Sequence, residues 1–166
     1  MSSIHSPHAE LGVIHTGAGA CRRRTCCSRD DASVWQAFIG SEAVRDGTLT
    51  RGQLRWRYTA VHPGVYLPNG AERSLSANTV AAWLWTGRGG IVAGRAAAAL
   101  HGALWVDDHT PVELIAPHTR PRPGIVIHED RISPGDICHI GELPVTTPAR
   151  TALDIARWLP RDAAVR

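Results

Sequence analysis

The spacing of the apolar residues changes along the chain, and this change most constrains the fold. Three segments carry apolar residues at the spacing of one helix face: Ala77, Val80, Ala81 and Leu84; Ala96, Ala99, Leu100 and Ala103; Ala149, Ala152, Leu153 and Ala156. Three short runs between Pro, Gly and Asp turns have the composition of strands instead: residues 112–115, 125–129 and 137–140. The helical segments and the strand segments form separate runs along the chain, and we expect an α+β fold.

A capping box marks the beginning of a short helix. Thr50 is followed three residues later by Gln53, so the two side chains can satisfy each other's backbone amides, and a helix should begin at Arg51. The preceding segment, residues 34–45, has a helical pattern and ends before the stop signal Gly47. We therefore expect two helices close together in this part of the chain.

Proline positions predict one turn and one further helix start. Residues 58–67 carry β-forming side chains on both sides of Pro63 and Gly64, which suit the central positions of a type II turn, so we expect a small hairpin. Thr147 followed by Pro148 predicts an N-cap and the first position of the last helix.

The basic residues are all arginine. The 166-residue chain has 18 basic residues, none of them lysine, and a net charge of +3. Coding bias in a GC-rich genome accounts for this composition, while an arginine surface also suits nucleic acid. Because the net charge is small, any affinity for nucleic acid must come from a local patch. No apolar run reaches the roughly 18 residues of a membrane-spanning helix, so we expect no membrane partner.

Residues 1–33 differ in composition from the remainder of the chain. They contain no apolar run of a secretory signal, so the reducing cytoplasm is the expected compartment. Histidines and cysteines in this segment could bind zinc, but Cys26 and Cys27 are adjacent and the spacing does not match a zinc site. We interpret residues 1–33 as a disordered leader or a misassigned start. Residues 160–166 begin like a helix and stop within two turns, which suggests a truncated chain.

Four segments, in order, carry a family resemblance: Thr50–Leu54 (TRGQL), Val61–Tyr66 (VHPGVY), Ala93–Gly102 (AGRAAAALHG) and Leu143–Asp154 (LPVTTPARTALD). Together they resemble the N-terminal region of AbiEi-type antitoxins of type IV toxin–antitoxin systems. The same region occurs in related actinobacterial proteins that continue into a domain like the very-short-patch-repair endonucleases. The resemblance covers roughly residues 38–165.

The resemblance implies a winged helix-turn-helix followed by a small α+β module. We place the reduced winged-helix region at residues 34–70 and the module, truncated at its C-terminus, at 71–166. In the antitoxins this region is implicated in binding operator DNA, and a nucleotidyltransferase toxin is the partner. This chain departs from its relatives in one respect: six residues separate Leu54 from Val61, where relatives place a full recognition helix.

The best candidate for nucleic-acid contact follows the capping box. The expected DNA-binding residues are Arg51, Gln53, Arg55, Arg57, Tyr58 and His62. Arginines on a short helix can hold phosphates, and a nearby aromatic such as Trp56 can pack on a sugar or base. The alternative is a solvated helix face with Trp56 and Tyr58 in the core. Three arginines release few counterions, so the expected affinity for DNA is weak and sensitive to salt.

No catalytic, cofactor or metal site is expected. A two-metal nuclease would bring Glu113, Glu129 and Asp130 together, but acidic residues are also ordinary at strand-ending turns. Asp107–His109 is interpreted as a turn, and His101 as a hydrogen-bonded structural residue. The predicted function is a non-catalytic, DNA-associated regulatory module. The alternative is a truncated interaction or structural fragment of a nuclease-like protein.

Overall fold

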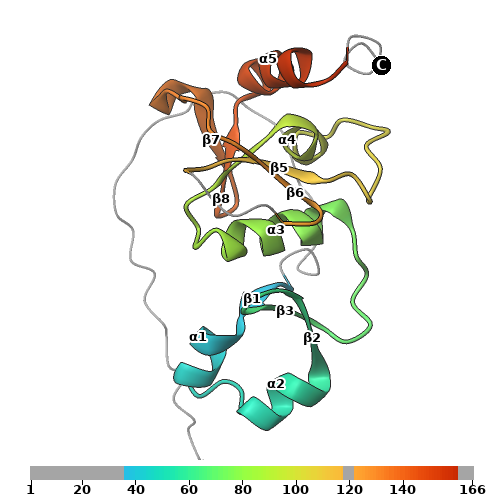
Figure 1. Cartoon of the computed structure of the whole chain (residues 1–166), viewed down its shortest axis with the longest axis vertical. Helices are drawn as coiled ribbons and strands as arrows, with labels where there is room; N and C mark the ends of the chain where they lie inside the picture. The colour runs from blue at the N-terminus through green and yellow to red at the C-terminus, as the bar shows by residue number, and fades with distance from the viewer. Residues whose placement is uncertain (1–35, 118–121, 161–166) are drawn as a thin grey trace, which may run out of the picture.

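The chain is mixed α+β, as the sequence predicts. The computed structural model describes residues 36–117 and 122–160, which contain five α-helices and two sheets (Figure 1). The first part of the chain consists of β1 (Phe38–Ile39), α1 (Gly40–Arg45), α2 (Arg51–Arg57), β2 (Tyr58–His62) and β3 (Val65–Pro68). The second consists of α3 (Leu75–Trp85), β4 (Ile91–Ala93), α4 (Gly94–Leu100), β5 (Val112–Ile115), β6 (Ile125–His128), a 3₁₀ turn at Pro134–Asp136, β7 (Ile137–Ile140), β8 (Leu143–Thr146) and α5 (Pro148–Trp158).

A small antiparallel sheet has the strand order β1-β3-β2. The predicted hairpin of β2 and β3 is confirmed, and Gly64 has the positive φ (79°) that the third position of a type II turn requires. The prediction of one helix over residues 34–45 is wrong at its start, because Phe38 and Ile39 pair with β3 and α1 begins only at Gly40. Residues 34 and 35 lie outside the described ranges.

The second sheet has five strands in the order β6-β5-β4-β8-β7. Its predicted members β5 and β7 are confirmed, and β6 ends one residue earlier than expected, at His128. Neither β4 nor β8 was predicted. They pair in parallel through Val92 and Val145, two residues far apart in sequence, and β8 contains Pro144, which disfavours a strand inside a sheet.

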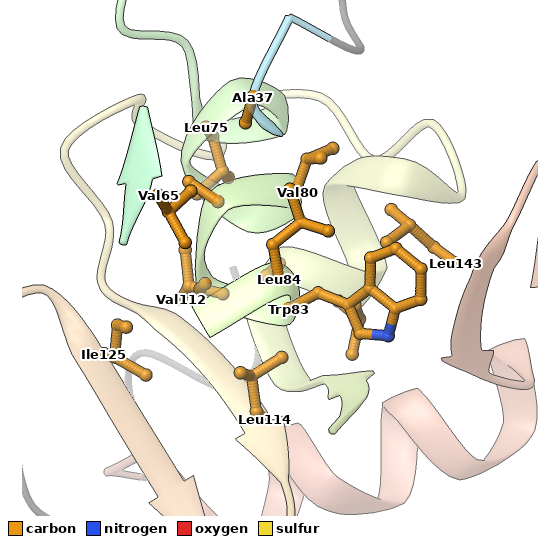
Figure 2. Packing of buried hydrophobic residues seen from close by; sticks show 14 of the residues in the cluster. Ala37, Val65, Leu75, Val80, Trp83, Leu84, Val112, Leu114, Ile125 and Leu143 are labelled. Atoms are coloured by element: carbon orange, nitrogen blue, oxygen red, sulfur yellow. The ribbon is translucent and has the colours of Figure 1, made fainter. Parts of the chain in front are cut away.

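Helix α3 lies between the two sheets, while α4 and α5 cover the opposite face of the larger sheet (Figure 1). One cluster of buried side chains runs from the small sheet through α3 into the five-stranded sheet. Figure 2 labels members of it from all three elements: Val65 of β3; Val80, Trp83 and Leu84 of α3; Val112 and Leu114 of β5. The two parts of the chain therefore share one core.

The predicted apolar face of α3 is confirmed, because Ala77, Val80, Ala81 and Leu84 are all buried. The predicted face of α4 is partly wrong. The helix ends at Leu100 because Gly102 takes a left-handed conformation (φ 92°), so Ala103 lies beyond the helix and is exposed. Ala97 is buried in place of Ala99, which is only half-buried.

Helix α5 begins as predicted, with Thr147 as N-cap and Pro148 in the first position. Its predicted buried stripe is wrong: Ala149, Ala152, Leu153 and Ala156 are all exposed. The buried side chains of this helix are instead Arg150, Thr151 and Asp154. Hydrogen bonds and ion pairs hold most of their polar atoms, which makes burial of these groups possible, although Oδ2 of Asp154 has no hydrogen-bond partner.

None of the helices in residues 36–117 and 122–160 combines the length and apolar character that crossing a bilayer requires.

Candidate nucleic-acid interface

The predicted capping box fixes the first turn of α2. Thr50 Oγ1 accepts a hydrogen bond from the Gln53 amide (3.2 Å), and Gln53 Oε1 accepts one from the Thr50 amide (2.8 Å). These bonds satisfy donors that a helix start otherwise leaves unpaired. Gln53, which the sequence places among the DNA contacts, therefore has its side-chain oxygen committed to the helix itself.

The arginines of α2 are all exposed but do not share one face. At 3.6 residues per turn, Arg55 lies about 40° around the axis from Arg51 and one turn further along. Arg57 lies about 200° from Arg55 and points to the other side of the helix. Only Leu54 is partly buried, and it packs toward Gly40. Arg51 and Arg55 therefore form one outward pair, and Arg57 stands apart from it.

No arginine of α2 forms an ion pair with a carboxylate in the described part of the chain. The two nearest acidic residues in the sequence have other partners. Glu42 of α1 accepts two hydrogen bonds from Arg88 (2.7 and 2.9 Å), which lower the pKa of Glu42. Asp46 contacts its neighbour Arg45 at 3.2 Å. The charge of α2 is thus available to a partner.

Trp56 is 81% exposed, which excludes it from the core. Its main chain is nevertheless held in place. The Asn69 side chain donates a hydrogen bond to the Trp56 carbonyl (2.8 Å), the Asn69 amide donates one to the Arg57 carbonyl (2.9 Å), and Asn69 Oδ1 accepts one from Thr59 (2.8 Å). The turn after β3 therefore anchors the C-terminal end of α2.

The two other predicted contact residues lie on β2 and pack inward. Tyr58 is half-buried and meets Phe38 edge to face, with ring centroids 4.9 Å apart. The His62 ring lies 6.0 Å from that of Trp85. Burial lowers the pKa of His62, with smaller contributions from Arg122 and Arg73. The structure thus places four of the six predicted residues on α2 and turns the rings of the other two toward aromatic neighbours.

A groove of about 460 Å³ separates α1 from α2, beside this surface. Its lining is mostly apolar, with two guanidinium groups: Gly40, Ser41, Val44, Arg45, Arg51, Leu54, Gly64 and Tyr66. Gly40 is required there, because an added Cβ would lie 2.5 Å from the Tyr66 ring.

The carboxylates considered for a nuclease site have separate partners. Glu113 is buried, accepts a hydrogen bond from the Arg95 amide (2.6 Å) and pairs with the Arg95 guanidinium (3.4 Å). Asp130 pairs with Arg157 at 2.9 Å. Glu129 is exposed. In the ranges described, no group of three or more His, Cys, Asp or Glu residues is placed to hold a metal ion.

Two further predictions are confirmed. Nε2 of His101 lies 2.7 Å from the Thr146 carbonyl, a structural hydrogen bond between the end of α4 and the end of β8. Asp107 Oδ1 accepts a hydrogen bond from the His109 amide (2.6 Å), and Asp108 Oδ1 accepts one from the Leu75 amide (2.8 Å), so this acidic segment forms a turn. The histidines and cysteines considered for zinc in residues 1–33 lie outside the described residues.

Asn69 is a structural anchor of this surface that is not among the residues predicted from the sequence. The signal that could have found it is the dipeptide Asn69–Gly70, a typical turn sequence directly after the predicted hairpin.

Comparisons with protein-family models, curated proteins and solved structures returned no match for this chain.

Proposed function

We propose that this chain is a non-catalytic, DNA-associated regulatory module that binds nucleic acid through α2. The observation that carries the proposal is the charge of this helix. Its three arginines are exposed and have no carboxylate partner among the described residues, while Glu42 and Asp46 are paired elsewhere. Unpaired guanidinium groups on a capped helix are suited to phosphate contacts.

The order of elements supports the resemblance to AbiEi-type antitoxins. Two short helices followed by the β2–β3 hairpin match the order of a reduced winged helix-turn-helix. In this proposal α2 faces the DNA backbone, the hairpin is the wing, and the five-stranded sheet with α4 and α5 is the module that follows. A nucleotidyltransferase toxin remains the partner that the resemblance implies.

Titration of DNA binding against salt tests this proposal. The full chain is mixed with labelled duplex from upstream of its own gene, and the dissociation constant is measured by fluorescence anisotropy over a range of salt concentrations. We expect weak binding whose log–log salt slope is about −0.9 for each phosphate neutralised. Replacing Arg51 and Arg55 with alanine should reduce the magnitude of that slope by about 2 and weaken binding to all sequences.

The control removes the same charge elsewhere. Arg73 and Arg131 are exposed and lie outside α2, so the double variant Arg73→Ala/Arg131→Ala has the same net charge as the α2 variant. An equal loss of DNA affinity in the two double variants would mean that only the total charge matters. That outcome would contradict an interface on α2.

One observation favours the alternative function, docking onto a partner chain. The outward side of α5 is apolar, and Leu153 on it is 52% exposed. A partner chain that covers this side would bury Leu153 without any involvement of α2. Loss of partner capture in Leu153→Glu, together with no DNA binding by the unmodified chain, would favour this alternative.

A further inference from the structure

Trp56 is the one large apolar side chain that α2 presents to water. Of the other four tryptophans in the described residues, Trp83 is buried, Trp85 packs near His62 and Trp158 stacks on His128, while Trp105 is exposed like Trp56. Leaving an indole exposed sacrifices the stabilisation that its burial would supply. A single exposed apolar side chain is ordinary by itself, so the inference depends on what surrounds Trp56.

The surroundings of Trp56 suit a polyanion. Arg55 and Arg57 flank it in sequence, and Trp56 lies about 100° around the helix from Arg55. Trp105, which is 96% exposed, has the opposite setting, because Asp107 and Asp108 follow it closely. Of these two exposed indoles, only Trp56 combines an aromatic face with neighbouring positive charge.

The geometry of α2 favours stacking over reading of base edges. Seven residues make a helix about 10 Å long, and only Arg51 and Arg55 share a face. Edge recognition in a major groove about 12 Å wide needs several side chains aimed at successive bases. Stacking needs one aromatic face on the protein and a base with a free face. Bases of a single strand meet this condition, whereas bases inside a duplex are already stacked on both sides.

The main chain of this surface is already ordered. Asn69 holds the carbonyls of Trp56 and Arg57, and the capping box holds the other end of the helix. Binding therefore needs to order only the side chains, which reduces its entropic cost.

We propose that Trp56 makes the α2 surface selective for single-stranded DNA, with the indole stacked on an unpaired base and Arg51 and Arg55 on the neighbouring phosphates. This inference rests on the proposed function, because it assigns the preferred nucleic acid to the same site.

The test compares one single strand of mixed sequence with the duplex that it forms with its complement, at equal salt, using the full chain. Trp56→Ala should weaken binding to the single strand by about 5-fold to about 150-fold, the range for loss of one stacked base, and should change duplex binding by less than about 2-fold. Trp56→Phe should retain most of the single-strand affinity. Trp105→Ala is the matched control, which removes an equally exposed indole beside acidic residues and should change neither affinity.

A spectroscopic measurement separates stacking from mere proximity. Single-strand binding should quench tryptophan fluorescence in the unmodified chain and in Trp105→Ala, and this quenching should be lost in Trp56→Phe although the strand is still bound. Thermal unfolding of each variant checks that it is folded.

The two proposals fail in different ways. Unchanged single-strand affinity in Trp56→Ala, with weakened binding in Arg51→Ala/Arg55→Ala, would overturn the stacking inference and leave the α2 interface standing. If Trp56→Ala lost the same factor in affinity for the single strand and for the duplex, the proposed selectivity for single-stranded DNA would also be overturned. No binding of either DNA at low salt would overturn both proposals.

Discussion

Glu113 is a buried carboxylate held at the start of α4. It accepts a hydrogen bond from the Arg95 amide, which is one of the amides that a helix start leaves without a partner, and it pairs with the Arg95 guanidinium. Gly94 makes this approach possible. Its φ is 55°, and an added methyl group would overlap the Glu113 carboxylate. At this residue the sequence shows an acid on a strand, and only the fold shows that it caps a helix.

Gly94→Ala should therefore destabilise the chain by more than about 2 kcal/mol, because it combines a left-handed conformation with the displacement of a buried carboxylate. Gly52→Ala is the matched control. Gly52 lies inside α2, where the nearest atom to an added Cβ is Thr50 Oγ1 at 3.9 Å. This control should leave stability unchanged or raise it by up to about 1 kcal/mol. Denaturant unfolding measures both, and equal effects would contradict this account of Gly94.

In helix α5, apolar spacing alone predicts the wrong side as the buried one. Its inner side carries Arg150, which bonds Asp154 of the same helix (2.8 Å) and pairs with Asp130 (3.6 Å) and Asp136 (3.5 Å) from outside it. Asp154 is 0% exposed. Removing one member of such a buried network leaves the opposite charges without compensation.

We accordingly expect Arg150→Ala to lower the free energy of unfolding by about 3–5 kcal/mol. Leu153→Ala, on the predicted apolar stripe, should change it by less than about 0.5 kcal/mol. Arg157→Ala is a charge-matched control on the same helix. Its side chain is half exposed where it pairs with Asp130, so its loss should cost about 1 kcal/mol or less. A larger effect of Leu153→Ala than of Arg150→Ala would mean that the apolar stripe is the packed side after all.

The elements that the sequence predicts well are those set by neighbours in the chain. The capping box at Thr50, the turn at Gly64 and the helix start at Pro148 each depend on contacts within a few residues. Strands β4 and β8 depend on the pairing of Val92 with Val145, which no local pattern encodes. The candidate site divides in the same way: the exposed arginines of α2 follow from the short helix, whereas the inward packing of Tyr58 and His62 depends on other elements.

At the scale of the whole molecule, two histidines connect edge strands to helices in the two parts of the chain. His62 of β2 lies beside Trp85 of α3, and His128 of β6 stacks on Trp158 of α5 with ring centroids 3.4 Å apart. Burial lowers the pKa of both histidines below the ordinary value of 6.5. For His128 this outweighs the opposing effects of Glu113, Asp130 and Asp154, and Arg157 lowers it further. Because one core joins the two parts, weakening either contact should destabilise the whole chain.

The sign of the pH dependence follows from these shifts. A histidine with a lowered pKa in the folded state binds fewer protons there than in the unfolded chain, so its contribution to stability is complete above 6.5 and is lost as the pH falls below that value. We expect the free energy of unfolding, measured with denaturant, to decrease between about pH 7.5 and about pH 5.5. The double variant His62→Gln/His128→Gln should show a smaller decrease over the same interval.

A second decrease in the free energy of unfolding should occur at lower pH, and it should have a separate origin. Arg88 lowers the pKa of Glu42 from its ordinary 4.5, so this ion pair stabilises the fold above that value and is lost as the pH falls through the lowered pKa. Because Glu42 belongs to α1 and Arg88 follows α3, the pair ties the first part of the chain to the second. Glu42→Gln should reduce the decrease in the free energy of unfolding at acidic pH and leave the decrease near pH 6.5 unchanged. A decrease near pH 6.5 that persists in full in the double histidine variant would contradict the assignment to His62 and His128.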